Sequence, residues 1–279
     1  MKEDKQGETD SGQRLWQDDK TFVRDSAFYS GAELADDPSA HLSKLDAHSR
    51  KVVAILAALL LLVVLAWFLW ADSYYRAEPA ALAVKTETAL PVEDWRGGIA
   101  LGDPASDIGF IFYPGGMVDE YAYLPLLEQI ARQDVLCVDV SMPFHLALLN
   151  TDACEAIIKR YPEVKTWYIG GHSLGGTMAA KYVAGHEEEF SGLVLLAAYP
   201  SAEIDLPILS IRGDRDGVLD MAEYAAAPWG PELKELVLEG ANHAGFGTYG
   251  AQKGDGEASI SAEEQQTLTA EAVLALLGK

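Results

Sequence analysis

The stretch Gly170-Gly171-His172-Ser173-Leu174-Gly175-Gly176 says most about the architecture of this chain. A short apolar run at Trp167–Ile169 predicts a strand before it, and Leu174–His186 has the length of a helix after it. The spacing Gly171-x-Ser173-x-Gly175 is typical of a tight strand-to-helix turn, where glycines avoid clashes and the serine hydroxyl is exposed. Three fixed residues alone are a weak signal, so the prediction of a serine turn depends on the strand before them and the helix after them.

Strand and helix signals alternate on both sides of this turn. The apolar runs that predict strands are Ile108–Tyr113, Val135–Val140, Trp167–Ile169, Leu193–Ala198, Ile208–Ile211 and Leu236–Leu238. The helix-length segments are Tyr121–Arg132, Thr151–Arg160, Leu174–His186, Met221–Ala227 and Ala262–Leu277.

This alternation predicts one α/β domain over residues 81–279, with a mostly parallel sheet and helices on both faces. Residues 85–101 could add one or two antiparallel strands at its start. About nine residues separate Ala198 from Ile208, too few for helices that cover a cleft, so we expect no large cap.

A serine at such a turn needs a base, and the fold places its partners in the chain order serine, acid, histidine. Two histidines follow Ser173. His186 falls at the end of the predicted helix, whereas His243 lies in a loop after the last strand, so His243 is the predicted base. His172 adjoins the serine but projects differently on a tight turn, and we interpret it as a packing residue.

The acid is expected after the strand Ile208–Ile211, in the sequence Gly213-Asp214-Arg215-Asp216-Gly217. Asp216 is preferred because it lies deeper in the loop, before a glycine that permits a sharp turn. Asp214 is the alternative, and both aspartates also favour the turn itself.

A developing oxyanion needs preorganised backbone N–H donors. Leu174, directly after the serine, predicts one donor. The other is expected in the loop Tyr113-Pro114-Gly115-Gly116-Met117, where we assign Met117 and keep Gly116 as the alternative.

Residues 52–71 are twenty residues without a charge, and a helix of this length spans about 30 Å, the thickness of a bilayer core. A buried core helix or a cleaved signal peptide are alternatives, but 51 residues precede the run, far more than a signal peptide has. We therefore predict a signal anchor over 52–71. A disordered cytoplasmic tail is expected before it, over 1–51, and the last residues of this tail could extend the helix. A linker is expected after it, over 72–80, in which Pro79 stops the helix. Basic residues flank the start of the span (Lys44, Arg50 and Lys51) and Arg76 alone follows it, which places the domain on the extracytoplasmic side of the cell membrane.

The chain has 21 Lys and Arg against 43 Asp and Glu, a net charge of −22. This excess argues against nucleic-acid binding, which needs a basic face. Two cysteines, Cys137 and Cys154, are too few for a zinc site built on cysteine. A disulfide between them stays open because sequence cannot give their distance. No metal-binding or phosphate-loop motif is present, and we expect no cofactor.

Five pieces of the sequence resemble the alpha/beta-hydrolase superfamily, and more narrowly the bacterial alpha/beta hydrolase fold-5 proteins. They are Tyr113–Met117, Met142–Phe144, Tyr168–Gly176, Gly213–Asp216 and Asn242–Gly247. The resemblance covers about residues 90–279. It implies a hydrolase with Ser173, Asp216 and His243 as its triad, and it supports Met117 as the second oxyanion donor.

The prediction from sequence is a membrane-anchored serine hydrolase that cleaves a carboxylic ester or a related small acyl substrate. A non-catalytic cell-surface binding domain on the same fold is one alternative, because fold does not fix function. Acyl transfer to an acceptor other than water is another, since it uses the same triad.

Overall fold

The computed structural model describes residues 46–71 and 73–279, so the predicted tail lies largely outside the described residues. The chain divides into two units, and the boundary falls after Val63, inside helix α2 (Ala47–Ala71). Asp46 caps this helix, since its carboxylate accepts the N–H groups of His48 and Ser49. Within the described residues, Ala47–Trp70 is the one helix long and apolar enough to cross a membrane, and none of its most apolar stretch is buried.

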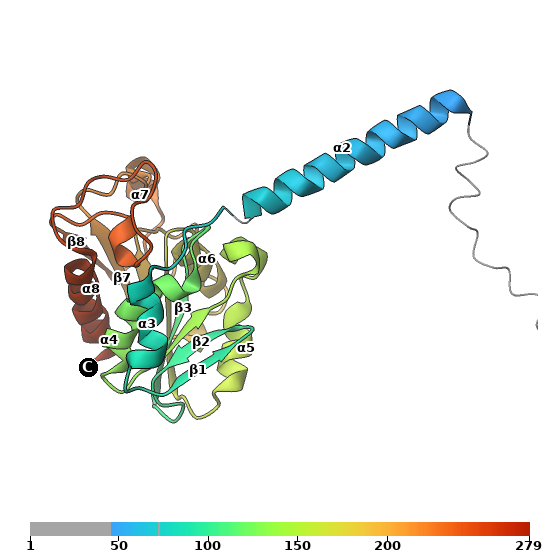
Figure 1. Ribbon diagram of the computed structural model, residues 1–279. Helices are drawn as coiled ribbons and strands as arrows, with labels where there is room; N and C mark the ends of the chain where they lie inside the picture. The colour runs from blue at the N-terminus through green and yellow to red at the C-terminus, as the bar shows by residue number, and fades with distance from the viewer. Residues whose placement is uncertain (1–45, 72) are drawn as a thin grey trace, which may run out of the picture. The chain divides into compact units, whose positions relative to one another are not determined.

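The domain is built on an eight-stranded sheet in the order β1-β2-β4-β3-β5-β6-β7-β8 (Figure 1). The six strands from β4 to β8 in this order are parallel to one another, whereas β2 is antiparallel to both β1 and β4. Their bounds are β1 Val92–Trp95, β2 Gly98–Leu101, β3 Ile108–Tyr113, β4 Leu136–Val140, β5 Thr166–His172, β6 Leu193–Leu196, β7 Ile208–Gly213 and β8 Leu233–Leu238. The predicted parallel sheet and its two leading antiparallel strands are confirmed.

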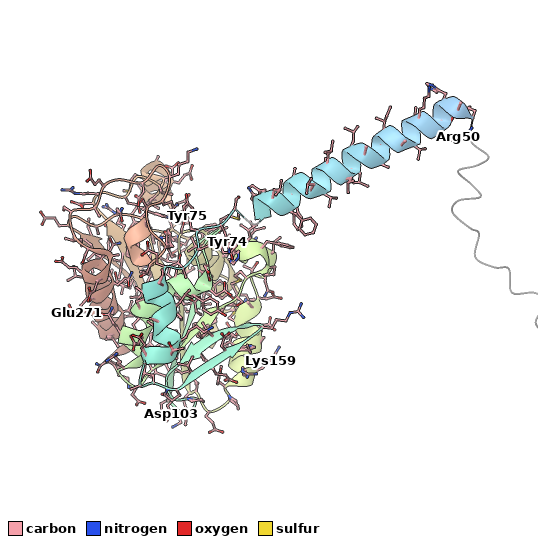
Figure 2. All side chains as sticks on the ribbon, viewed as in Figure 1. Arg50, Tyr74, Tyr75, Asp103, Lys159 and Glu271 are labelled. Atoms are coloured by element: carbon pink, nitrogen blue, oxygen red, sulfur yellow. The ribbon has the colours of Figure 1, made fainter. Side chains whose placement is uncertain are left out.

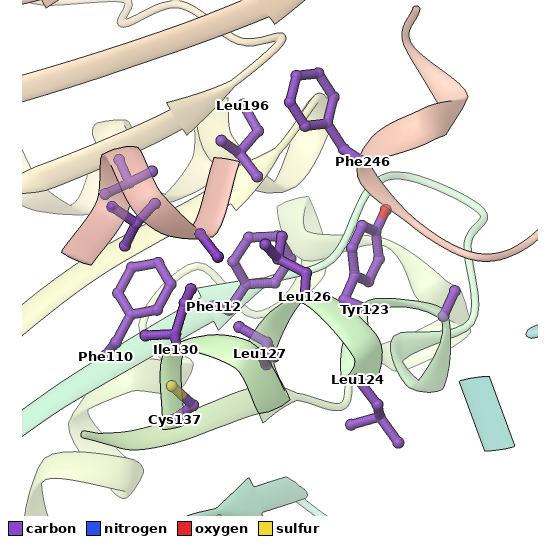
Figure 3. Packing of buried hydrophobic residues seen from close by; sticks show 14 of the residues in the cluster. Phe110, Phe112, Tyr123, Leu124, Leu126, Leu127, Ile130, Cys137, Leu196 and Phe246 are labelled. Carbon is purple, nitrogen blue, oxygen red and sulfur yellow. The ribbon is translucent and has the colours of Figure 1, made fainter. Parts of the chain in front are cut away.

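Helices cover both faces of the sheet. Alternate residues of β3 point to opposite sides, so Phe110 and Phe112 join one apolar core while Ile111 and Tyr113 join the other. Figure 3 shows Phe110 and Phe112 packed against Leu127 and its neighbours from α4. The helices are α3 Pro79–Glu87, α4 Leu124–Ala131, α5 Ala153–Arg160, α6 Leu174–Val183, α7 Met221–Ala226 and α8 Ala262–Leu277.

The two cysteines are free and buried. Cys137 belongs to the core under α4, and Cys154 belongs to the core on the other face of the sheet. The sheet therefore separates the two thiols, and the disulfide considered from sequence is not formed.

The connection between β6 and β7 has no helix, which confirms the expectation of a fold without a large cap. The segment 72–80, predicted as a linker, is hydrogen-bonded to the domain from Tyr75 onward. Pro79 does not end α2, which stops at Ala71; it is instead the first residue of α3, where proline is well tolerated.

Candidate active site

The turn between β5 and α6 carries Ser173 in a strained backbone conformation. Its φ of 52° and ψ of −124° lie outside the common regions for a residue with a side chain. The Ser173 N–H donates to the carbonyl oxygen of Leu196 at 2.9 Å, which anchors the turn to β6. The structure thus has the strand, tight turn and helix that the sequence motif requires.

The glycines on either side of the serine are required by backbone crowding. A Cβ at Gly171 would lie 2.5 Å from the carbonyl oxygen of Tyr113, and one at Gly175 would overlap the carbonyl oxygens of Tyr113 and Pro114. Any side chain at these positions would push the serine turn away from the loop after β3.

His243 and Asp216 form a buried pair after β8 and β7. The His243 Nδ1 lies 2.8 Å from the Asp216 Oδ2, and each side chain is 1% exposed. The other carboxylate oxygen accepts the N–H groups of Val218 and Leu219 at 2.8 Å. Burial raises the pKa of Asp216, but the hydrogen bond from His243 and these N–H groups outweigh it, so the pKa is lowered and the carboxylate stays ionised.

The alternative residues considered from sequence lie elsewhere. Asp214 accepts the N–H of Gly240 at 2.7 Å and has no bond to His243. His186 stacks on the Tyr182 ring and bonds the Tyr182 carbonyl oxygen through Nδ1. Of the two aspartates and the two histidines, only Asp216 and His243 are brought together.

The free nitrogen of His243, Nε2, is buried and has no hydrogen-bond partner within the described part of the chain. No hydrogen bond therefore joins it to the Ser173 hydroxyl. Catalytic hydrogen bonds are often long without substrate and tighten in the reacting complex.

His172 lies under the base, with its ring centroid 4.5 Å from that of His243. Gly115 donates its N–H to the Tyr123 hydroxyl, which lies 2.9 Å from the His172 Nδ1. The hydroxyl can then donate to Nδ1, while the His172 Nε2 is buried and has no hydrogen-bond partner among the described residues. Burial and the neighbouring His243 hold the pKa of His172 well below its ordinary value, so the ring is neutral. His172 is thus a packing residue, as expected, and it also adds no charge beside the base.

Asp255 ties together the loops that carry the acid and the base. Its Oδ1 accepts the N–H groups of Gly217 at 3.1 Å and His243 at 3.2 Å, and its Oδ2 accepts that of Ala244 at 2.8 Å. Asp255 was not among the site residues predicted from sequence. An aspartate between two glycines reads as an ordinary turn, and nothing local marks it out.

The loop after β3 lies against the start of α6. A Cβ at Gly116 would lie 2.9 Å from the Leu174 side chain, and neither the Gly116 nor the Leu174 N–H has an acceptor among the described residues. The Met117 N–H, in contrast, donates to the His145 carbonyl oxygen at 2.8 Å. The donor assigned from sequence is therefore already engaged, and the alternative, Gly116, is the one that is open.

Among residues 46–71 and 73–279, no group of three or more His, Cys, Asp or Glu side chains could hold a metal ion.

Solved structures with similar folds were found, although a search of curated proteins gives no match. TT1662 from Thermus thermophilus is 13% identical with a TM-score of 0.51, over 69% of this chain and 100% of that chain. Est1E from Butyrivibrio proteoclasticus, bound to ferulic acid, is 14% identical with a TM-score of 0.50, over 68% and 100%. A monoacylglycerol lipase from Paleococcus ferrophilus is 13% identical with a TM-score of 0.50, over 68% and 100%.

The sequence itself matches a family model. The alpha/beta hydrolase family model covers residues 109–267, a span that contains Ser173, Asp216 and His243 and more than half of the chain. This match supports hydrolase activity, and the solved structures show the same fold. The chain belongs to the alpha/beta hydrolase family.

Proposed function

We propose that this protein is a membrane-anchored serine hydrolase that cleaves carboxylic esters with Ser173, His243 and Asp216. One observation carries the proposal: the ionised Asp216 holds the His243 Nδ1 at 2.8 Å, at the edge of the sheet where the strained turn presents Ser173. A carboxylate in this position fixes the tautomer of the imidazole and leaves Nε2 as the base.

In the proposed mechanism the Ser173 oxygen attacks the ester carbonyl carbon while His243 takes its proton. The tetrahedral oxyanion is held by backbone N–H groups. We propose those of Leu174 and Gly116, in place of Met117, because Met117 is bonded to His145. The imidazolium then protonates the leaving alcohol, and water, deprotonated by His243, releases the acid from Ser173. This mechanism uses no cofactor.

Alanine variants test the proposal on p-nitrophenyl esters of graded chain length. Ser173→Ala and His243→Ala should each lower kcat by about 10⁴-fold or more, and the double variant should lose little more, because the two residues act as one unit. Asp216→Ala should cost less than either. Full ester turnover by a folded Ser173→Ala protein would overturn the mechanism and favour a binding domain.

Asp214→Ala is the matched control for the acid. Asp214 lies two residues from Asp216, and within the described part of the chain its carboxylate bonds only the Gly240 N–H, so the variant should keep most of its activity. Thermal melting of each variant checks that it is folded. If Asp214→Ala were inactive and Asp216→Ala active, the acid assignment would fall while the hydrolase proposal stood.

We also propose that α2 spans the cell membrane with the domain outside the cytoplasm. The apolar length of α2 and the basic residues before it support this. Protease added to spheroplasts should digest the domain. Protection of the domain with loss of residues 1–51 would reverse the orientation.

A further inference from the structure

The segment that follows α2 is attached to the loop that carries the open oxyanion donor. The Tyr75 N–H donates to the Met117 carbonyl oxygen at 2.7 Å, and the Asp119 N–H donates to the Tyr75 carbonyl oxygen at 2.9 Å. These bonds form a parallel bridge between Tyr75 and Val118. Because backbone bonds are made on both sides of Val118, this part of the loop is held in place. Gly116, the open oxyanion donor, directly precedes Met117 in the same loop.

The same segment is attached to the loop that follows the base. The Glu78 N–H donates to the Thr248 carbonyl oxygen at 2.9 Å, and the Lys253 N–H donates to the Tyr75 hydroxyl at 3.1 Å. The segment is therefore hydrogen-bonded to two loops: the one that carries Gly116 and the one that follows His243. Figure 2 shows Tyr75 with Tyr74 at the end of the domain opposite Asp103.

Tyr74 adds a side-chain contact on this edge. Its ring stacks on that of His145, with centroids 3.9 Å apart. His145 is the residue whose carbonyl oxygen accepts the Met117 N–H. The chain next to α2 is thus packed against both partners in that hydrogen bond.

Chain length then limits how far this edge can lie from the end of α2. Only residues 72–74 separate Ala71 from Tyr75, so the two Cα atoms lie at most about 14 Å apart in any orientation. The headgroup layer of a bilayer is about 5–8 Å thick on each side. If α2 spans the membrane, the edge that carries Tyr75 and Met117 is held in the headgroup layer or just above it.

Exposed apolar side chains also occur in the loops that leave the carboxyl end of the sheet. Outside α2, the described residues include eight large apolar side chains that are exposed, and five of them follow the carboxyl ends of β4 and β7. The five are Phe144, Leu148, Leu149, Val218 and Met221. We call them the apolar rim. Phe144 and its neighbour His145 have φ angles of 54° and 55°, a strained backbone arrangement. The Phe144 side chain stays partly exposed, although its ring contacts that of Trp67 edge-on.

The charge of the domain limits which lipid surfaces the apolar rim can contact. Residues 72–279 contain 13 Lys and Arg and 32 Asp and Glu, a net charge of −19. A strongly negative domain is repelled by anionic headgroups. Apolar contact and a short tether remain available, and these favour neutral or zwitterionic lipids.

From these observations we infer that the active site works at the surface of the bilayer that holds α2, on neutral or zwitterionic amphiphilic esters residing in that bilayer. The inference rests on the proposed function and on the proposed anchor, and it adds the substrate class. The tether keeps the edge that carries Tyr75 and Met117 at the headgroup layer, and the apolar rim contacts the amphiphilic esters there.

The test uses the full chain in phosphatidylcholine vesicles with two esters. One is p-nitrophenyl acetate in solution, and the other is 4-methylumbelliferyl palmitate carried in the vesicle. A flexible twenty-residue Gly-Ser insertion between Asp72 and Ser73 lengthens the tether and keeps every contact from Tyr74 onward. The matched control adds the same twenty residues after Lys279.

Lengthening the tether from 3 to 23 residues lowers the effective concentration of the site at the membrane by roughly tenfold or more. The ratio of palmitate to acetate rates should fall by about that factor in the insertion variant and stay unchanged in the control. The double variant Leu148→Gln, Leu149→Gln should also lower this ratio, whereas Leu268→Gln, exposed on α8, should not.

An unchanged ratio in the insertion variant, with both esters hydrolysed, would overturn this inference and leave the proposed function intact. Absence of turnover on both esters in the wild-type protein would overturn the proposed function, and the inference with it. A higher rate on anionic than on zwitterionic vesicles would contradict the assigned substrate charge.

Discussion

Replacing Asp255 by alanine should separate the loops that hold the acid and the base. The substitution removes four backbone bonds to a carboxylate: those from Gly217, His243 and Ala244 and one from the adjacent Gly256. Hydrogen bonds to charged groups contribute about 1.5–3 kcal/mol each. The bonds from Gly217 and His243 exceed 3.0 Å, the bond from Gly256 is local, and Asp255 is half-buried, so we expect a loss of about 2–4 kcal/mol of unfolding free energy. The domain should stay folded, with a melting temperature lower by about 5–15 °C.

Activity should fall more than stability alone explains. The bonds from Asp255 fix the His243 backbone relative to the turn that carries Asp216, and a displacement of about 1 Å in a catalytic group can cost about 10²-fold. We expect kcat on p-nitrophenyl butyrate to fall by about that factor while KM changes little. The kcat of Asp255→Asn should lie between those of the wild-type protein and Asp255→Ala, because the asparagine keeps one acceptor oxygen but turns an amide group toward the other N–H donors.

Asp103→Ala is the matched control. Its carboxylate accepts the N–H of Ala105 within its own turn, at the end of the domain away from Tyr75 (Figure 2). It should lower the unfolding free energy by no more than about 1 kcal/mol and leave kcat unchanged. Steady-state kinetics of the three variants give kcat, and urea unfolding gives the free energy of unfolding. Wild-type kcat in a destabilised Asp255→Ala protein would refute the positioning role.

Two further predictions concern the neighbours of the serine turn. As pH falls from 6.5 toward 4.5, the unfolding free energy of the wild-type protein should drop by up to about 1.4 kcal/mol per pH unit on account of His172, because the unfolded chain binds a proton there and the buried ring, with its lowered pKa, does not. His172→Gln should lack this pH dependence in urea unfolding. An equal slope in the two proteins would contradict the role of His172. Gly175→Ala should destabilise the domain by several kcal/mol because its Cβ would overlap the Tyr113 and Pro114 carbonyl oxygens. Gly185→Ala, where the Cβ meets nothing within 4 Å, should be neutral in the same assay, and equal stability of the two variants would count against the crowding argument.

The sheet and the serine turn could be predicted because their signals are local. Apolar runs of strand length stand between helix-length segments, and the glycines at 171 and 175 mark a turn in which only backbone fits. The order serine, acid, histidine then left few candidates for each partner. Placing Asp216 rather than Asp214 beside His243 followed from loop depth, and the structure has that contact.

The parts that sequence could not give depend on contacts between distant residues. Asp255 meets Gly217 across 38 positions of the chain, and Tyr123 meets His172 across 49. The Met117 N–H is engaged by His145, a residue in a strained loop after another strand. The segment after α2 has the composition of a linker, and its pairing with Val118 is visible only in the folded chain.

Covalent labelling of Ser173 tests the central claim most directly. The full chain is treated with a fluorophosphonate, and the modified peptide is mapped by mass spectrometry, with Ser173→Ala and His243→Ala treated in parallel. The account predicts a phosphonyl group on Ser173 in the wild-type protein, none at this position in Ser173→Ala, and strongly slowed labelling in folded His243→Ala. A folded wild-type protein that stays unlabelled, or a label on another serine, would contradict it.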